Sequence, residues 1–166
     1  LFTSYHNLNR VHMYLKEAVS FPVYRQGEAP KTALLERFKA EADSVLLATG
    51  SFWQGVDVPG ESLGCLIIDK LPFGSPGEPL TAARIDSVKA RGGNPFLEYQ
   101  LPSAIISLKQ GMGRLIRSNS DRGVFALLDG RLRKKWYGRL FLKSLPDAPI
   151  TETLSDVADF YTGGHE

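Results

Sequence analysis

The chain has 166 residues, of which 43% are hydrophobic and 23% charged. This balance fits one globular domain and excludes an intrinsically disordered segment. No run approaches the about 20 consecutive apolar residues that a membrane helix needs, and no signal peptide is visible at the start. We therefore expect a cytoplasmic protein without membrane contact. The net charge of +2 hides a strong asymmetry along the chain.

Apolar spacing predicts short strands that alternate with helices. The expected strands cover residues 1–5, 22–25, 44–48, 63–69 and 123–128, and the expected helices cover about 7–19, 30–38, 80–91 and 102–116. Such alternation is typical of an α/β fold, a parallel sheet covered by helices on both faces. Ligands of these sheets bind beyond the carboxyl ends of the strands, so the loops after Ala48, Asp69 and Asp129 are the first places to search.

The metal-binding residue types lack the grouping of a metal site. Cys65 lies in an apolar run, residues 63–68, and is predicted to be a small buried hydrophobe rather than a ligand or nucleophile. His6, His12 and His165 have no Cys or His partner at zinc-site spacing, so no metal is predicted.

Charge divides the chain into two parts. Between Leu101 and Leu145 basic residues far outnumber the acidic Asp121 and Asp129, which predicts an anionic partner. After Pro146 the chain carries acidic residues and no Lys or Arg. We therefore expect a domain over residues 1–145 and an acidic C-terminal helix and tail over residues 146–166. The basic residues of the first part are Lys109, Arg114, Arg117, Arg122, Arg131, Arg133, Lys134, Lys135, Arg139 and Lys143.

The end of the helix expected over 102–116 presents two guanidinium groups and an amide on one face. At about 100° per residue, Gln110, Arg114 and Arg117 fall within roughly 60° of one another. The opposite arc is apolar and suited to packing on the sheet. The arginine face can clamp phosphate, or it can be a solvated face with ordinary salt bridges. Glycines at 111 and 113 weaken the helix by about 1 kcal/mol each, which indicates a close backbone approach.

A second polar stretch, residues 48–60, directly follows an expected strand. Its glycines permit tight turns with exposed amides, and Thr49, Ser51 and Asp57 add hydroxyls and a carboxylate, a set that suits phosphates and a ribose. Phe52 and Trp53 can stack on bases, although aromatics beside a buried strand are more often core residues.

These stretches resemble motifs V and VI of superfamily 2 helicases, in the same order and about fifty residues apart. The form Gly-Ser-Phe-Trp-Gln-Gly-Val-Asp, residues 50–57, is similar to the DinG, YoaA and XPD branch. Residues 1–5 resemble the motif IV strand of that branch, and residues 71–73 resemble its next loop. The resemblance covers residues 1–145.

The resemblance implies a RecA-like parallel sheet sandwiched between helices, acting as the second motor lobe of an ATP-dependent 5′–3′ DNA helicase. ATP would lie between two lobes, and single-stranded DNA would cross both. Arg114 and Arg117 would then be arginine fingers, with Gln110 positioning the phosphate or attacking water. The other implied contacts are Gly55, Asp57 and Gly113 with the nucleotide, and Ser4, Thr49 and Ser51 with the DNA backbone.

The chain lacks the phosphate-cradling Gly-x-x-x-x-Gly-Lys-Ser/Thr loop and an Asp-Glu pair for magnesium. We therefore expect a first helicase lobe elsewhere in a longer bacterial, nucleoid-associated polypeptide to hold ATP and Mg²⁺. The fragment alone is then predicted to be inactive. An iron–sulfur cluster, bound by many relatives, would belong to the parent and not to this chain.

Two other functions fit some of the residues. The acidic segment 151–161 predicts a short helix, and the chain is alternatively a protein-interaction module that docks a replication or repair partner. A YoaA-like parent would point to the clamp-loader chi subunit as that partner. A third possible function is that of a self-contained nucleotide-binding enzyme.

A basic cluster follows the last expected strand. It either contacts the sugar-phosphate backbone or forms a solvated basic helix end, and its members are Arg131, Arg133, Lys134 and Lys135.

Overall fold

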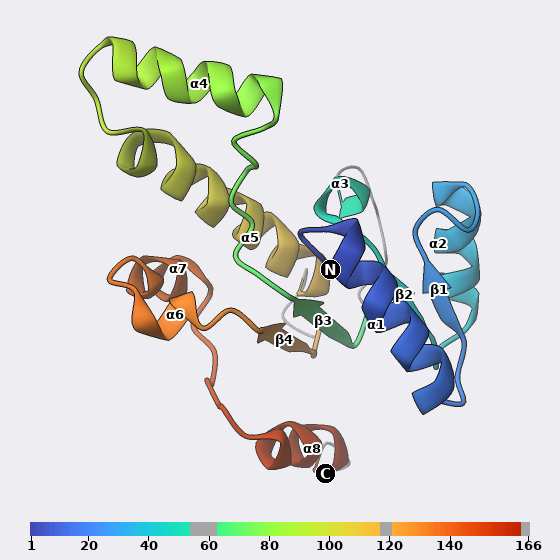
Figure 1. The fold of residues 1–166 in the computed structure, drawn as a ribbon. Coiled ribbons are helices and arrows are strands. Elements are labelled where there is room, and N and C mark those ends of the chain that lie inside the picture. The colour runs from blue at the N-terminus through green and yellow to red at the C-terminus, as the bar shows by residue number, and fades with distance from the viewer. Residues whose placement is uncertain (54–62, 117–120, 164–166) are drawn as a thin grey trace.

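The computed structural model describes residues 1–53, 63–116 and 121–163, and its elements alternate largely as the sequence predicts (Figure 1). The strands are β1 (Val23–Arg25), β2 (Val45–Leu47), β3 (Cys65–Ile68) and β4 (Val124–Leu127). The helices are α1 (Tyr5–Ala18), α2 (Lys31–Ala40), α3 (Gly50–Trp53), α4 (Pro79–Ala90), the π-helix η2 (Phe96–Gln100), α5 (Leu101–Leu115), α6 (Arg131–Lys134), α7 (Gly138–Ser144) and α8 (Leu154–Thr162).

The strands pair in parallel, as predicted. β1 pairs with β2, and β3 pairs with β4. Leu1 and Phe2 lie between these pairs, since the Phe2 amide donates to the Ala48 carbonyl at 2.8 Å and the Asp69 amide donates to the Leu1 carbonyl at 3.0 Å. The spatial order is therefore β1, β2, residues 1–2, β3, β4.

The strand expected over residues 1–5 is wrong beyond Phe2. Ser4 is the N-cap of α1, and its hydroxyl accepts a hydrogen bond from the Asn7 amide at 3.4 Å. A capping serine takes extended backbone angles and satisfies an amide of the first turn, so the helix begins at Tyr5.

The core forms where α5 packs on one face of β3. Leu66 and Ile68 of β3 are buried in one cluster with Leu108 and Leu115 of α5 and Phe141 of α7. This confirms the predicted apolar face of the helix. Burial of side chains of this size stabilises the fold by about 2 kcal/mol each.

The opposite face of β3 is open. Cys65 is exposed and Ile67 is 48% exposed, because alternate strand residues point to opposite faces and α5 covers only one of them. Both residues line an apolar groove of about 620 Å³, together with side chains of α1, α2 and β2. The prediction of a buried Cys65 is therefore wrong, and the described residues do not confirm a sheet covered on both faces at β3.

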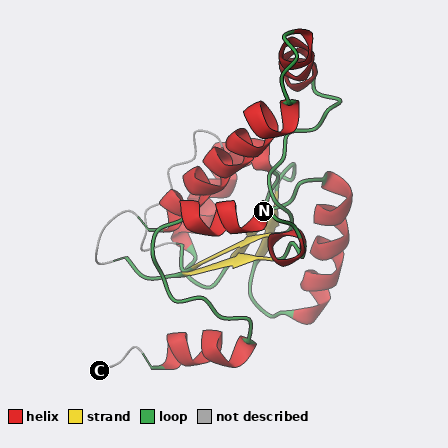
Figure 2. Ribbon diagram, turned by 90° about the vertical axis from the view of Figure 1, so that its left-hand side faces the viewer, coloured by secondary structure: helices red, strands yellow, loops and turns green. Residues whose placement is uncertain are grey.

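The last helix, α8, stands apart from the other helices (Figure 2). Its contact with the sheet includes a hydrogen bond from the Tyr161 hydroxyl to the Gly64 carbonyl at 2.7 Å. Leu154 at its start is 88% exposed. No helix among the described residues has the length and apolar character to cross a membrane.

Candidate functional site

The polar face predicted on α5 is present in the structure. Gln110 and Gly113 are exposed and Arg114 is half-buried, whereas Leu108 and Leu115 on the other side are buried. Within the described residues Arg114 has no ion pair with a carboxylate. Its guanidinium is therefore not neutralised by that part of the chain.

Arg114 lies at the edge of the sheet where β3 and β4 begin. The Val124 amide donates to the Gly64 carbonyl at 3.0 Å, immediately before the two strands. Leu115 packs against the same point, since a Cβ on Gly123 would lie 2.6 Å from Leu115 Cδ1 and 2.9 Å from the Gly64 carbonyl oxygen. Arg114 therefore lies at the opposite edge from the loops after Ala48, Asp69 and Asp129, which the sequence marks as the first places to search for a ligand.

Several predicted site residues fall outside the described part of the chain. These are Gly55, Asp57 and Arg117, within residues 54–62 and 117–120. Ser51 belongs to α3, but its side chain is also outside the described part. Of the nucleotide-contact set, the structure thus places Gln110, Gly113 and Arg114 on one helix end.

The predicted DNA-contacting residues lie at the other edge, where the strands end. Thr49 is buried, and both its amide and its hydroxyl donate to Gln26 Oε1, at 2.7 and 3.0 Å. The Gln26 side chain in turn donates to the Tyr5 hydroxyl at 2.7 Å. Gln26 therefore fixes the chain beyond β2, a role that no sequence signal indicated. The hydroxyl of Ser4 already caps α1 on this edge.

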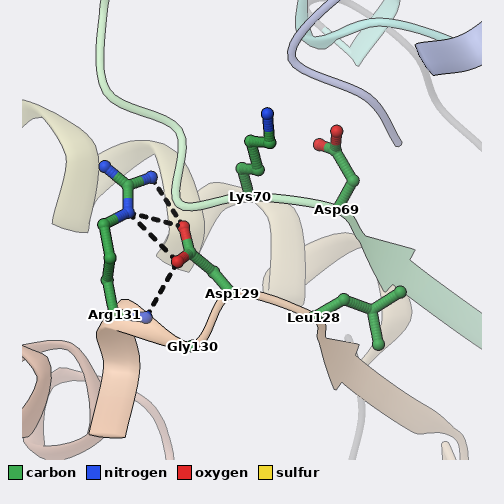
Figure 3. Close-up of a pocket in the computed structure, with 6 residues that line it drawn as sticks. All are labelled: Asp69, Lys70, Leu128, Asp129, Gly130 and Arg131. Atoms are coloured by element: carbon green, nitrogen blue, oxygen red, sulfur yellow. Dashed lines mark hydrogen bonds and ion pairs between the residues drawn. The ribbon is translucent and has the colours of Figure 1, made fainter. Parts of the chain in front are cut away.

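A polar pocket of about 390 Å³ opens where β3 and β4 end (Figure 3). Asp69 accepts a hydrogen bond from the Thr3 amide at 2.9 Å, and the exposed Lys70 extends away from the Asp129–Arg131 pair. The pocket therefore offers one ammonium beside two carboxylates that already have partners. Its lining residues are Asp69, Lys70, Leu128, Asp129, Gly130 and Arg131.

Asp129 organises this pocket. Burial alone would raise the pKa of its carboxyl, but hydrogen bonds from the Arg131 guanidinium and from the amides of Leu71 and Arg131 outweigh burial and lower that pKa from 3.8 to about 2. The Leu71 amide donates to Asp129 at 2.8 Å, which ties the loop after β3 to the end of β4. The Arg131 guanidinium also lies 5.2 Å above the Phe73 ring.

Sequence reasoning pointed to the loops that contain these residues but not to the clamp that they form. The pairing of Asp129 with Arg131 is local, with Arg131 Nη2 and Asp129 Oδ2 2.6 Å apart. The third member, Leu71, is 58 residues away in the chain. Within the described residues, no cluster of His, Cys, Asp and Glu suits a metal ion.

Comparison with known proteins identifies the class to which this parallel sheet and its arginine-bearing helix belong. The helicase C-terminal domain family matches residues 1–148. The chain therefore belongs to the helicase C-terminal domain family.

Individual relatives narrow the class further. The chain is 49% identical over 160 residues to the ATP-dependent DNA helicase YoaA of Haemophilus influenzae, and 44% identical over 146 residues to the ATP-dependent helicase DinG of Mycobacterium tuberculosis. It is 39% identical over 171 aligned positions to the 3′-5′ exonuclease DinG of Bacillus subtilis. These alignments cover 96%, 88% and 100% of this chain, but only 25%, 22% and 18% of the relatives.

Proposed function

We propose that the chain is the second motor lobe of an ATP-dependent 5′–3′ DNA helicase, with a RecA-like sheet. The observation that carries this proposal is the end of α5 in a helicase C-terminal domain, where Gln110 and Gly113 are exposed and Arg114 is half-buried beside the apolar groove. A first lobe on the same polypeptide holds ATP and Mg²⁺ in this proposal, and the two lobes enclose the nucleotide.

Arg114 and Arg117 act as arginine fingers in the proposed mechanism. As the bond to the γ-phosphoryl group breaks, negative charge develops on its oxygens, and two guanidinium groups stabilise that charge. Gln110, four residues before Arg114, orients the phosphate or the attacking water. Gly55, Asp57 and Gly113 complete the nucleotide contacts of this lobe.

Single-stranded DNA runs along the other edge of the sheet in this proposal. The hydroxyls of Ser4 and Ser51 contact its backbone, whereas Thr49 is buried and its hydroxyl proton is already donated to Gln26, so Thr49 shapes this edge rather than donating to a phosphate. The two proposed sites are separate in the fold, since Arg114 lies where β3 and β4 begin and Thr49 lies where β2 ends.

The test is substitution of Arg114 in the complete protein that contains this chain. Arg114→Ala should lower DNA-stimulated ATP turnover by about 10³- to 10⁵-fold, the range for an arginine finger. Lys109→Ala is the matched control, because it removes an exposed cation from the same helix and leaves the proposed site intact. Equal turnover in the Arg114→Ala variant and the wild type would refute the assignment.

A second function has one observation in its favour. α8 stands apart, exposes Leu154 and begins an acidic tail, which suits a docking segment for a replication or repair protein such as the clamp-loader chi subunit. Deletion of the residues after Pro149 separates the two functions. Loss of partner binding with full DNA-stimulated ATP turnover supports the docking role, and loss of turnover argues against it.

A further inference from the structure

An exposed tryptophan occupies the elbow between α6 and α7. Trp136 is 55% exposed, although its neighbour Tyr137 is only 9% exposed. The indole makes edge contacts with Phe96, at a centroid distance of 6.4 Å, and with Tyr137, at 5.7 Å. Trp136 therefore lies at the rim of an aromatic cluster, with more than half of its surface open.

The elbow that carries Trp136 is held tightly. The Gly138 amide donates to the Lys135 carbonyl at 3.0 Å and closes the turn around the tryptophan. A Cβ on Gly138 would lie 1.9 Å from the Leu132 carbonyl oxygen, so α6 and α7 approach more closely than any other residue permits. Tyr137 packs beneath the elbow against Phe96, at 5.2 Å. The indole is therefore presented on a preorganised turn.

The sequence around this tryptophan is rich in cations. Residues 130–146 contain six Lys or Arg residues and no Asp or Glu. Arg131 and Arg133 are paired with Asp129 and Glu152. Lys134, Lys135 and Arg139 are exposed and have no carboxylate partner among the described residues. The surface near the indole is therefore positively charged, which favours an anionic partner.

We propose that Trp136 is a stacking platform for a base of single-stranded DNA, and that Lys134, Lys135 and Arg139 bind the adjacent phosphates. The inference rests on the proposed function for the identity of the ligand and extends its DNA track. α6 begins directly after the pocket at the end of β4, which Lys70 also lines, and α6 and α7 lie beside that end of β4 (Figure 1).

The chemistry favours a single strand over other anions. A duplex buries the faces of its bases, whereas a single strand offers them to aromatic side chains, and each such stack stabilises binding by roughly 1–3 kcal/mol. An acidic protein surface would satisfy the lysines but would leave the indole without a matching ring. A rigid indole next to unpaired cations matches a chain that alternates bases and phosphates.

The experiment measures the affinity of the complete protein for two labelled oligomers of equal length by fluorescence anisotropy. One is oligothymidylate and the other is an abasic strand with the same phosphates. Trp136→Ala should raise the Kd for oligothymidylate roughly tenfold, with little change for the abasic strand. Trp136→Phe should restore most of the affinity. Lys134→Ala combined with Lys135→Ala should weaken binding of both strands and flatten its salt dependence.

The outcomes separate this inference from the proposed function. Tyr14→Ala on α1, which removes another exposed aromatic side chain, should leave both affinities unchanged. Equal weakening for the two strands in the Trp136→Ala variant would show a structural role and overturn the stacking. If the wild type binds oligothymidylate and Trp136→Ala binds it with the same affinity, this inference fails and the proposed function is unaffected. A wild type that binds neither strand overturns the proposed function and the inference together.

Discussion

Replacement of Asp129 by Asn should destabilise the fold and alter its dependence on pH. The Asp129 side chain is only 8% exposed, and its carboxylate accepts hydrogen bonds from the guanidinium and amide of Arg131 and from the Leu71 amide. These bonds lower its pKa from 3.8 to about 2. At 1.36 kcal/mol per pKa unit, this shift corresponds to about 2 kcal/mol of stability at neutral pH.

The sign of the pH dependence follows from that shift. Because the pKa of Asp129 is lower in the folded state than in the unfolded state, the unfolded chain binds the proton more readily. The stabilisation is therefore complete above about pH 5, declines as the pH falls through the interval between 3.8 and about 2, and is lost below it. Asp129→Asn removes the titrating group and should flatten this part of the profile.

The assay is urea unfolding of the 166-residue chain between pH 7 and pH 2. Asp86→Asn is the matched control, because Asp86 pairs with Lys89 at 3.7 Å with side chains 75% and 63% exposed, and such surface pairs contribute at most about 1 kcal/mol. The reasoning is refuted if the wild type and Asp129→Asn have the same free energy of unfolding at pH 7. It is also refuted if their difference in free energy of unfolding is the same at pH 2 as at pH 7. A double-mutant cycle with Arg131→Gln then isolates the energy of the pair.

Substitution by alanine should change the stability of the fold in opposite directions at two glycines. Gly138→Ala places a Cβ against the Leu132 carbonyl and should lower the free energy of unfolding by about 3 kcal/mol or more. Urea unfolding measures this loss, and a loss below about 1 kcal/mol would contradict the close approach of α6 and α7. Gly113→Ala meets nothing within 4 Å and should stabilise α5 by about 1 kcal/mol. In the complete protein the same Gly113→Ala change should reduce ATP turnover, and unchanged turnover would remove Gly113 from the nucleotide site.

Local patterns in the sequence predicted much of the fold. Alternating short apolar runs and helical spacings predicted parallel strands, and the structure pairs β1 with β2 and β3 with β4 in parallel. The periodicity of residues 102–116 predicted which side of α5 is buried, and Leu108 and Leu115 confirm it. These predictions succeed because strand and helix periods, and the burial of apolar faces, are properties of neighbouring residues.

Apart from the strand end at Ser4, which a local N-cap decides, the failed prediction and the missed roles depend on contacts between distant parts of the chain. Cys65 lies in an apolar run typical of a buried strand, yet its exposure is decided by what covers its face of β3, and that face borders the apolar groove. Gln26 and Asp129 carry no recognisable motif, because their roles arise only when Thr49 and Leu71 are brought beside them. Tertiary partners of this kind cannot be read from local spacing.

In the proposed mechanism, α5 links the two ligand sites that we propose at opposite edges of the sheet. The end of α5 carries Arg114 at the edge where β3 and β4 begin, and Leu108 in its middle is buried in the same cluster as Phe141 of α7. Both Leu108 and Phe141 are fully buried, and such tightly packed contacts transmit displacement rather than absorb it. In the proposed mechanism, a displacement of Arg114 by the nucleotide would therefore carry α7 and the Trp136 elbow with it, without an internal hinge in the lobe.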